Sequence, residues 1–225
     1  MDGCAGTMKL FFKKKPLFPL FQRGGLLVIF LLSGNSYAED SLSSLMQRMQ
    51  SETAVKIAYQ EIRTLELMDQ PWHGSGYMYS IAPDLMIREQ LKPKRLLMGI
   101  KADKMFYFDP GHSMHHQTDM DDDNPLSLNI AVFKALVTAD EALLRRMYLI
   151  EFSNKPARWV MTLKSKLQSQ SEFSIVVSGL TEQPADTIII KQADGDLSEF
   201  MLQQVAQGDK VKKVANRLYS ELTGE

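Results

Sequence analysis

The spacing of hydrophobic and polar residues after position 41 predicts one helix followed by a long run of strands. Leu42, Leu45, Met46 and Met49 follow one another at the i, i+3, i+4, i+7 spacing of a single helix face. The segment 54–65 instead alternates apolar and polar residues, which is typical of a half-buried strand. The domain is therefore expected to begin with an amphipathic helix that leads into a sheet.

Short apolar segments fill most of the remaining chain, and turn residues separate them. A turn-rich stretch, 69–76, precedes the first group, and Pro83 and Pro93 divide that group further. The predicted strands are 77–82, 85–91, 95–101, 104–109, 148–152, 157–163, 173–179, 186–192 and 197–205. This rhythm of short strands with turns between them favours an antiparallel meander.

Helical spacing returns twice after the first group of strands. Between residues 125 and 147 it predicts two short helices, and Thr138 and Glu141 have the spacing of a capping box for the second one. The segment 210–222 is predicted to form a terminal helix. The fold class is therefore α+β, with an antiparallel sheet of about ten or eleven strands and helices packed across it. A sheet of this size curls strongly, so we expect the helices to cover its concave face.

The first 38 residues have a different character from the rest of the chain. A basic segment precedes the short apolar run "GGLLVIFLLSG", and small residues, Ser36 and Ala38, stand before a favourable cleavage point. This order is typical of a secretory signal peptide, either from Met1 or from a start at Met8. The apolar run is short for a permanent membrane helix, although an uncleaved anchor is the alternative. We predict a signal peptide over 1–38 and one domain over 39–225.

Removal of such a signal changes the charge and the thiol content. Residues 39–225 contain 21 Lys and Arg against 26 Asp and Glu, a formal charge of −5. The only cysteine, Cys4, would be removed, which excludes disulfide and thiol chemistry from the exported protein. The acidic balance gives no indication of nucleic-acid binding. We expect an exported protein.

Four segments carry local motifs: "YMYSIAPDLMIRE" at 77–89, "IKADKMFYFDP" at 100–110, "NPLSLNIAVFKAL" at 124–136 and "RWVMTLKSK" at 158–166. These segments resemble the outer-membrane lipoprotein carrier proteins, the LolA-like family. Their order along most of residues 41–206 is that of a divergent member. The resemblance implies an incomplete β-barrel with a helical lid, in a monomeric protein of the periplasm of a Gram-negative bacterium. It also implies a carrier that moves an acylated cargo from an inner-membrane donor transporter to an outer-membrane acceptor. Because exposure of an acyl chain to water costs about 0.8 kcal/mol per methylene group, a carrier needs a deep apolar cavity.

The resemblance implies a set of lipid-binding residues on the strands and on the lid helix. The strand candidates are Tyr77, Tyr79, Arg88, Phe106 and Phe108, and the lid candidates are Leu126, Ile130, Phe133 and Leu136. An ordinary packed core would produce the same apolar pattern.

The position before Pro83 departs from the family pattern. Family members carry at this position an arginine that latches the lid, whereas this chain has Ala82, which leaves Arg88 as the nearest cation. The cargo and the opening mechanism of this protein are therefore open.

Other functions have weaker sequence support. A phosphate-binding loop, a nucleophile elbow and a zinc-protease motif are all missing from the sequence, so we predict that the protein is not an enzyme and needs no cofactor. The stretch "GHSMHHQTDMDDDNP" at 111–125 raises a metal-binding alternative through His112 and His116, but two histidines are fewer than the ligands usual for zinc, and a solvated strand edge and loop explains the stretch better. The other alternative is an envelope sensor or interaction module of the same fold that binds a protein partner.

Overall fold

The computed structural model describes residues 42–50, 53–119, 132–136, 138–166 and 172–225, all within one compact unit, Ala38–Glu225. The predicted signal peptide and the residues Leu126 and Ile130 lie outside the described residues. Within the described ranges, no helix is both long enough and apolar enough to cross a membrane.

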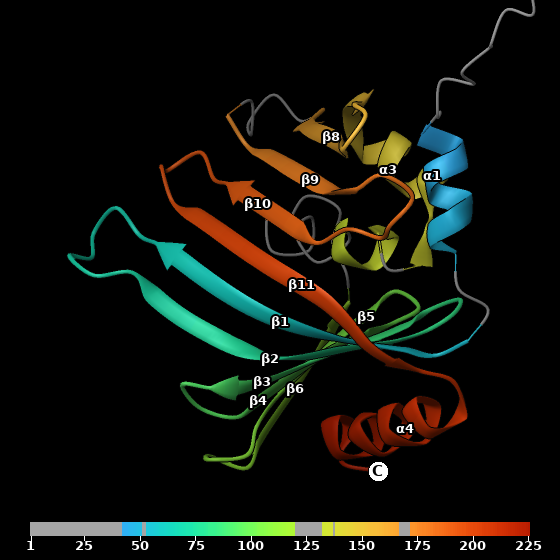
Figure 1. Ribbon diagram of the computed structural model, residues 1–225. Coiled ribbons are helices and arrows are strands. Elements are labelled where there is room, and N and C mark those ends of the chain that lie inside the picture. The colour runs from blue at the N-terminus through green and yellow to red at the C-terminus, as the bar shows by residue number, and fades with distance from the viewer. Residues whose placement is uncertain (1–41, 51–52, 120–131, 137, 167–171) are drawn as a thin grey trace, which may run out of the picture. The chain divides into compact units, whose positions relative to one another are not determined.

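The sheet contains eleven antiparallel strands and is not closed into a barrel, which confirms the predicted fold class. Its order is β6-β5-β4-β3-β2-β1-β11-β10-β9-β8-β7, so that the two halves of the chain meet where β1 pairs with β11. Figure 1 shows the sheet folding back on itself, with α1 and α3 on its inner side and α4 outside it. The strands are β1 Val55–Thr64, β2 Trp72–Ile81, β3 Leu85–Lys92, β4 Leu96–Lys101, β5 Lys104–Asp109, β6 Met114–Asp119, β7 Tyr148–Asn154, β8 Arg158–Ser165, β9 Ser174–Leu180, β10 Thr187–Lys191 and β11 Leu197–Gln207.

The described helices are α1 Leu42–Met49, α3 Glu141–Met147 and α4 Asp209–Thr223, and residues 132–136 are also helical. The predicted helices at both ends of the domain are confirmed. The predicted capping box is wrong, because the carboxylate of Asp140 caps α3 by accepting the backbone N–H of Leu143 at 2.9 Å. The hydroxyl of Thr138 instead donates to the carbonyl of Lys134.

Two strands depart from the sequence prediction. β2 begins at Trp72, inside the stretch predicted as a turn. A Cβ atom on Gly76 would lie 2.0 Å from the carbonyl oxygen of Glu89, so the glycine permits this close approach of β3. β6 is not among the strands predicted above, but it forms within the stretch 111–125 that was interpreted as a solvated strand edge and loop, and all of its residues are exposed at the edge of the sheet.

The inner face of the sheet holds the larger hydrophobic cluster. Ten of the eleven strands, all but β6, contribute buried side chains to it, together with Leu45 of α1, Phe133 of the helical segment and Leu144 of α3. Burial of a large apolar side chain contributes about 1.5–3 kcal/mol, so these contacts attach each helix to the sheet.

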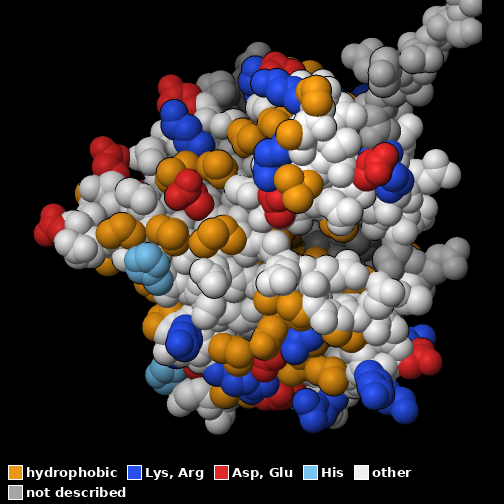
Figure 2. Space-filling model, in the orientation of Figure 1, with side chains coloured by type: hydrophobic (Ala, Val, Ile, Leu, Met, Phe, Trp, Pro, Cys, Tyr) orange, Lys and Arg blue, Asp and Glu red, His pale blue; other side chains and the backbone are white. Residues whose placement is uncertain are grey.

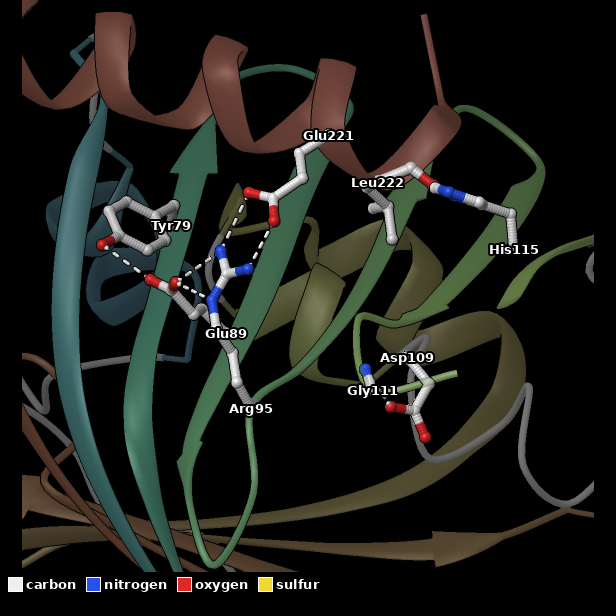
Figure 3. A network of polar contacts seen from close by, with 8 residues as sticks. All are labelled: Tyr79, Glu89, Arg95, Asp109, Gly111, His115, Glu221 and Leu222. Atoms are coloured by element: carbon white, nitrogen blue, oxygen red, sulfur yellow. Dashed lines mark hydrogen bonds and ion pairs between the residues drawn. The ribbon is translucent and has the colours of Figure 1, made fainter. Parts of the chain in front are cut away.

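The outer face of β2–β5 packs against α4 in a second cluster. Val211, Ala215, Leu218 and Leu222 of α4 are all buried there. Polar contacts add to this packing, as Figure 3 shows for Arg95, which lies between Glu89 of β3 and Glu221 of α4. The two clusters have no residue in common, so the sheet has a separate hydrophobic core on each face.

Candidate ligand-binding cavity

A cavity of about 750 Å³ opens on the inner face of the sheet. This volume lies within the range of roughly 300–1,000 Å³ that is typical of sites enclosing a small ligand. Its wall is formed by eight strands that are consecutive in the sheet, in the order β6, β5, β4, β3, β2, β1, β11 and β10. The helical segment 132–136 also contributes to the wall. The cavity is therefore built by the curvature of the sheet, and Phe133 contributes from the helical side.

Methionine is the most frequent residue in the wall. Met78, Met86, Met98 and Met105 come from four successive strands, β2 to β5. In the register of these strands, Met78 and Met98 flank Arg88, and Met86 and Met105 flank Ile100. The remaining apolar wall includes Leu65, Ile100, Phe106, Phe133, Ile190 and Phe200. Unbranched thioether side chains adapt to irregular shapes, which suits the binding of a flexible chain.

Charged side chains occupy one part of this apolar wall. Glu61 of β1 is fully buried and accepts hydrogen bonds from Arg88 of β3 and from Arg63, the latter at 2.5 Å. The Nε of Arg88 also donates to the hydroxyl of Tyr59 at 3.0 Å, and the guanidinium lies over the rings of Tyr59 and Phe200. Burial raises the pKa of Tyr59, so this hydroxyl stays protonated beside the arginine.

The predicted site residues divide between the two faces of the sheet. Arg88 and Phe133 lie in the cavity wall, and Leu136 belongs to the inner cluster beside it. Tyr77, Tyr79, Phe106 and Phe108 instead belong to the outer cluster with α4.

Contacts on the outer face fix these aromatic residues. Phe106, which also borders the cavity, packs edge-to-face on Tyr219 of α4, with ring centroids 5.7 Å apart. Tyr77 borders a second hollow of about 490 Å³ on the outer side, between β11, β1 and β2. Burial raises the pKa of Tyr79 to about 12, and its hydroxyl donates to Glu89. Figure 2 shows hydrophobic side chains on one outer surface in several groups, separated by charged residues.

The sequence analysis did not identify several residues of the cavity wall. On β2 and β5 these residues, Met78 and Met105, alternate with the predicted aromatic residues and point to the inner face of the sheet. On β1, Glu61 and Arg63 share the parity of the buried Tyr59, which was a signal for their inward position. The predicted aromatic positions lie mainly in the outer cluster, because the sheet is covered on both sides and alternation does not distinguish its faces.

The histidines of the 111–125 stretch make separate contacts. His112 lies in the turn before β6 and binds Asp109, His115 stacks on Phe108 and contacts the carbonyl of Leu222, and His116 borders the cavity beside Tyr107. Nowhere in the described part of the chain do three or more His, Cys, Asp or Glu side chains group as metal ligands, and residues 121–123 lie outside that part.

The amino-acid sequence matches a known protein family. The family model described as "Outer membrane lipoprotein carrier protein LolA-like" matches residues 35–216. No curated protein sequence matches the chain.

Several solved structures are similar to the chain. A LolA superfamily protein, NE2245 from Nitrosomonas europaea, has 8% identity and a TM-score of 0.41, over 76% of this chain and 92% of that one. A putative outer membrane lipoprotein-sorting protein domain from Vibrio parahaemolyticus has 9% identity and a TM-score of 0.46, over 80% and 97%. A chain in the structure of the CwlD amidase from Clostridioides difficile in complex with the GerS lipoprotein has 10% identity and a TM-score of 0.37, over 66% of this chain and 82% of that one.

The match to the family model is a match of sequence, and it spans most of the domain. The curved open sheet with its inner helices agrees with this family assignment. The chain belongs to the outer membrane lipoprotein carrier protein LolA-like family.

Proposed function

We propose that this protein is a periplasmic carrier that binds an acyl chain of a lipoprotein, or of another lipidated cargo, in the inner cavity. The observation that carries the proposal is the cavity of about 750 Å³ with its wall of methionine and aromatic side chains. Transfer of about ten methylene groups into such a site contributes about 8 kcal/mol, which corresponds to a Kd of about 1 μM. The predicted signal peptide and the family membership support transport from the inner to the outer membrane.

The polar groups of the cavity support binding rather than catalysis. Glu61 and Arg88 bond to each other, and Tyr59 accepts a further hydrogen bond from Arg88. A general acid or base must instead be free to reach a reacting group. We therefore propose that the protein is not an enzyme.

A substitution that fills the cavity tests the carrier proposal. Met98 borders the cavity and is only half-buried, so the larger side chain of Met98→Trp has room to enter it. We expect the affinity for a fluorescent long-chain fatty acid to fall at least tenfold, because the indole occupies the volume that the chain requires. Fluorescence titration of the delipidated protein measures this affinity, and native mass spectrometry shows whether lipid accompanies the wild-type protein during purification.

The matched control is Met201→Trp on β11. Met201 follows the inward-facing Phe200, is exposed on the outer side, and borders the hollow that also contains Tyr77. We expect its affinity to equal that of the wild type, and thermal unfolding verifies that both variants fold. Loss of binding in Met201→Trp with retention in Met98→Trp would move the ligand to the outer hollow, and no binding by the wild type would contradict the carrier proposal.

A further inference from the structure

The cavity contains a charged cluster that an acyl chain alone does not require. Its members are Glu61, Arg63 and Arg88, on the inner face of β1 and β3. The side chain of Glu61 has no exposed surface, that of Arg88 is 14% exposed and that of Arg63 is 39% exposed. The cluster therefore extends from the buried interior to the accessible part of the cavity.

Burial of such charges has an energetic cost. Removal of a carboxylate and a guanidinium from water costs several kcal/mol per ion, and their mutual attraction often does no more than balance it. Apolar side chains of similar volume would stabilise the sheet at least as well and would bind hydrocarbon better. In ligand sites, a few polar groups in an apolar wall fix the orientation of the ligand.

The cluster retains positive charge and donors for a ligand. Two arginines face one glutamate, which leaves a net charge of +1. Each guanidinium has five N–H donors, and the contacts described above engage two of them in Arg88 and one in Arg63. The planar group of Arg63 also lies over the ring of Trp72, 4.9 Å from its centroid, which holds it in place at the cavity.

Three other ionisable side chains border the same cavity: Asp196, His116 and Tyr107. Asp196 lies in the turn before β11, where its Oδ1 accepts the backbone N–H of Glu66 at 3.0 Å. His116 lies on the opposite wall, on β6, beside Tyr107. Among the described residues of the wall, the two arginines of the cluster are therefore the permanently positive groups.

We propose that Arg63, Glu61 and Arg88 form a subsite for the anionic head group of an amphiphile whose acyl chain lies among the methionines. The head group carries carboxylate or phosphate oxygens, which accept two parallel N–H bonds from a guanidinium. Arg63 is the primary contact because its side chain is the more accessible, and Glu61 orients both arginines. This proposal rests on the carrier function and specifies the chemical class of the ligand.

Three ligands with the same chain separate the contribution of the head group from that of the chain. Palmitate supplies a carboxylate, a palmitoyl lysophosphatidate supplies a phosphate, and methyl palmitate supplies no charge. Displacement of a fluorescent fatty-acid probe measures the affinity of each. We expect wild-type protein to bind both anions more tightly than the ester, by about tenfold or more, which is the range of a charge-assisted hydrogen bond.

Substitutions in the cluster act in opposite directions. Arg63→Gln is expected to lower the affinity for the anions about tenfold and to leave the ester unchanged. Glu61→Gln is expected to raise the affinity for the anions, because the competing carboxylate is removed. Because the side chain of Arg63 is partly exposed, Arg63→Gln is expected to fold. This variant alone therefore tests the subsite if Glu61→Gln does not fold.

Arg158→Gln is the matched control. Arg158 is 41% exposed, pairs with Asp186, and lies outside the cavity wall. We expect all three affinities of this variant to equal those of the wild type.

The outcomes separate this proposal from the carrier function. Equal affinity for ester and anions, unaffected by Arg63→Gln, would overturn the subsite and leave the carrier function in place. Failure of all three ligands to bind would contradict the carrier function itself. A larger loss for one of the two anions supports the subsite and identifies its head group.

Discussion

At the scale of single residues, acid–base pairs connect strands and helices on both faces of the sheet. The ion pair of Glu61 and Arg88 connects β1 to β3 on the inner face. On the outer face, Arg95, which directly precedes β4, pairs with Glu221 of α4. The bond from Arg95 lowers the pKa of Glu221. Exposed ion pairs contribute little to stability, at most about 1 kcal/mol, so the outer pair serves mainly to orient the helix.

Hydrogen bonds hold the pKa of Asp109 well below its ordinary value. Its carboxylate accepts hydrogen bonds from Lys94, His112 and the backbone N–H of Gly111, all at 2.9–3.0 Å. The bond from Lys94, followed by that from His112, lowers the pKa of Asp109 to about 2, from an ordinary value of 3.8. The charged form is therefore favoured in the folded state.

This shift predicts a specific loss of stability in acid. Because the folded-state pKa is depressed, the contribution of Asp109 is complete above about pH 4 and is lost as the pH falls from about 4 through about 2. Asp109→Asn is expected to reduce the dependence of the unfolding free energy on pH within that window. Urea unfolding at several pH values measures the slope.

Asp119→Asn provides the comparison for this prediction. Asp119 lies on exposed β6 and contacts Lys104, so its replacement should leave the slope unchanged. An Asp109→Asn slope equal to that of the wild type would show that these hydrogen bonds do not favour ionisation.

At the scale of elements, the sequence predicts the strands more reliably than it predicts which face they bury. Met78 and Tyr79 are neighbours on β2, and both are nearly fully buried, one in each cluster. A sheet covered by helices on both faces has apolar residues at both parities, so alternation cannot identify the cavity side. Arg88 was placed in the cavity by its position after Pro83, but its partner Glu61 lies 27 positions earlier, a pairing that only the fold reveals.

The terminal helix illustrates the other limit of sequence reasoning. Its apolar face was predicted correctly, and Val211, Leu218 and Leu222 are buried. The predicted position of this helix was wrong, because the helix covers the outer face of β2–β5 rather than the concave face. Helical spacing identifies a face that must be covered, but it does not specify the surface that covers it.

Packing of α4 predicts a measurable contribution to stability. Leu218 is buried against the sheet, so Leu218→Ala removes apolar contacts and leaves a cavity, with an expected loss of about 2–5 kcal/mol in unfolding free energy. Chemical denaturation measures this loss. Asn216→Ala, on the exposed side of the same helix, should change the free energy by less than about 0.5 kcal/mol. Similar values for the two variants would argue against a packed α4.

At the scale of the whole domain, ligand binding and folding stability are linked. A ligand that binds only the folded state stabilises it by about 2.7 kcal/mol when its free concentration is 100 times the Kd. For a domain of this size, each kcal/mol raises Tm by about 2–4 °C. Palmitate is therefore expected to raise the Tm of the delipidated protein by about 5–10 °C.

Calorimetry with and without palmitate tests this linkage. Met98→Trp should show a much smaller increase, because its cavity is filled, whereas Met201→Trp should match the wild type. An equal increase in all three proteins would place the stabilising ligand outside the cavity.

The separation of the two hydrophobic clusters has a consequence for cooperativity. α1, the helical segment 132–136 and α3 contribute only to the inner cluster, while α4 contributes only to the outer one. Detachment of the inner helices would therefore leave β2–β5 supported by α4 on their other side. We therefore expect local opening on one face of the sheet to need less free energy than global unfolding of the domain.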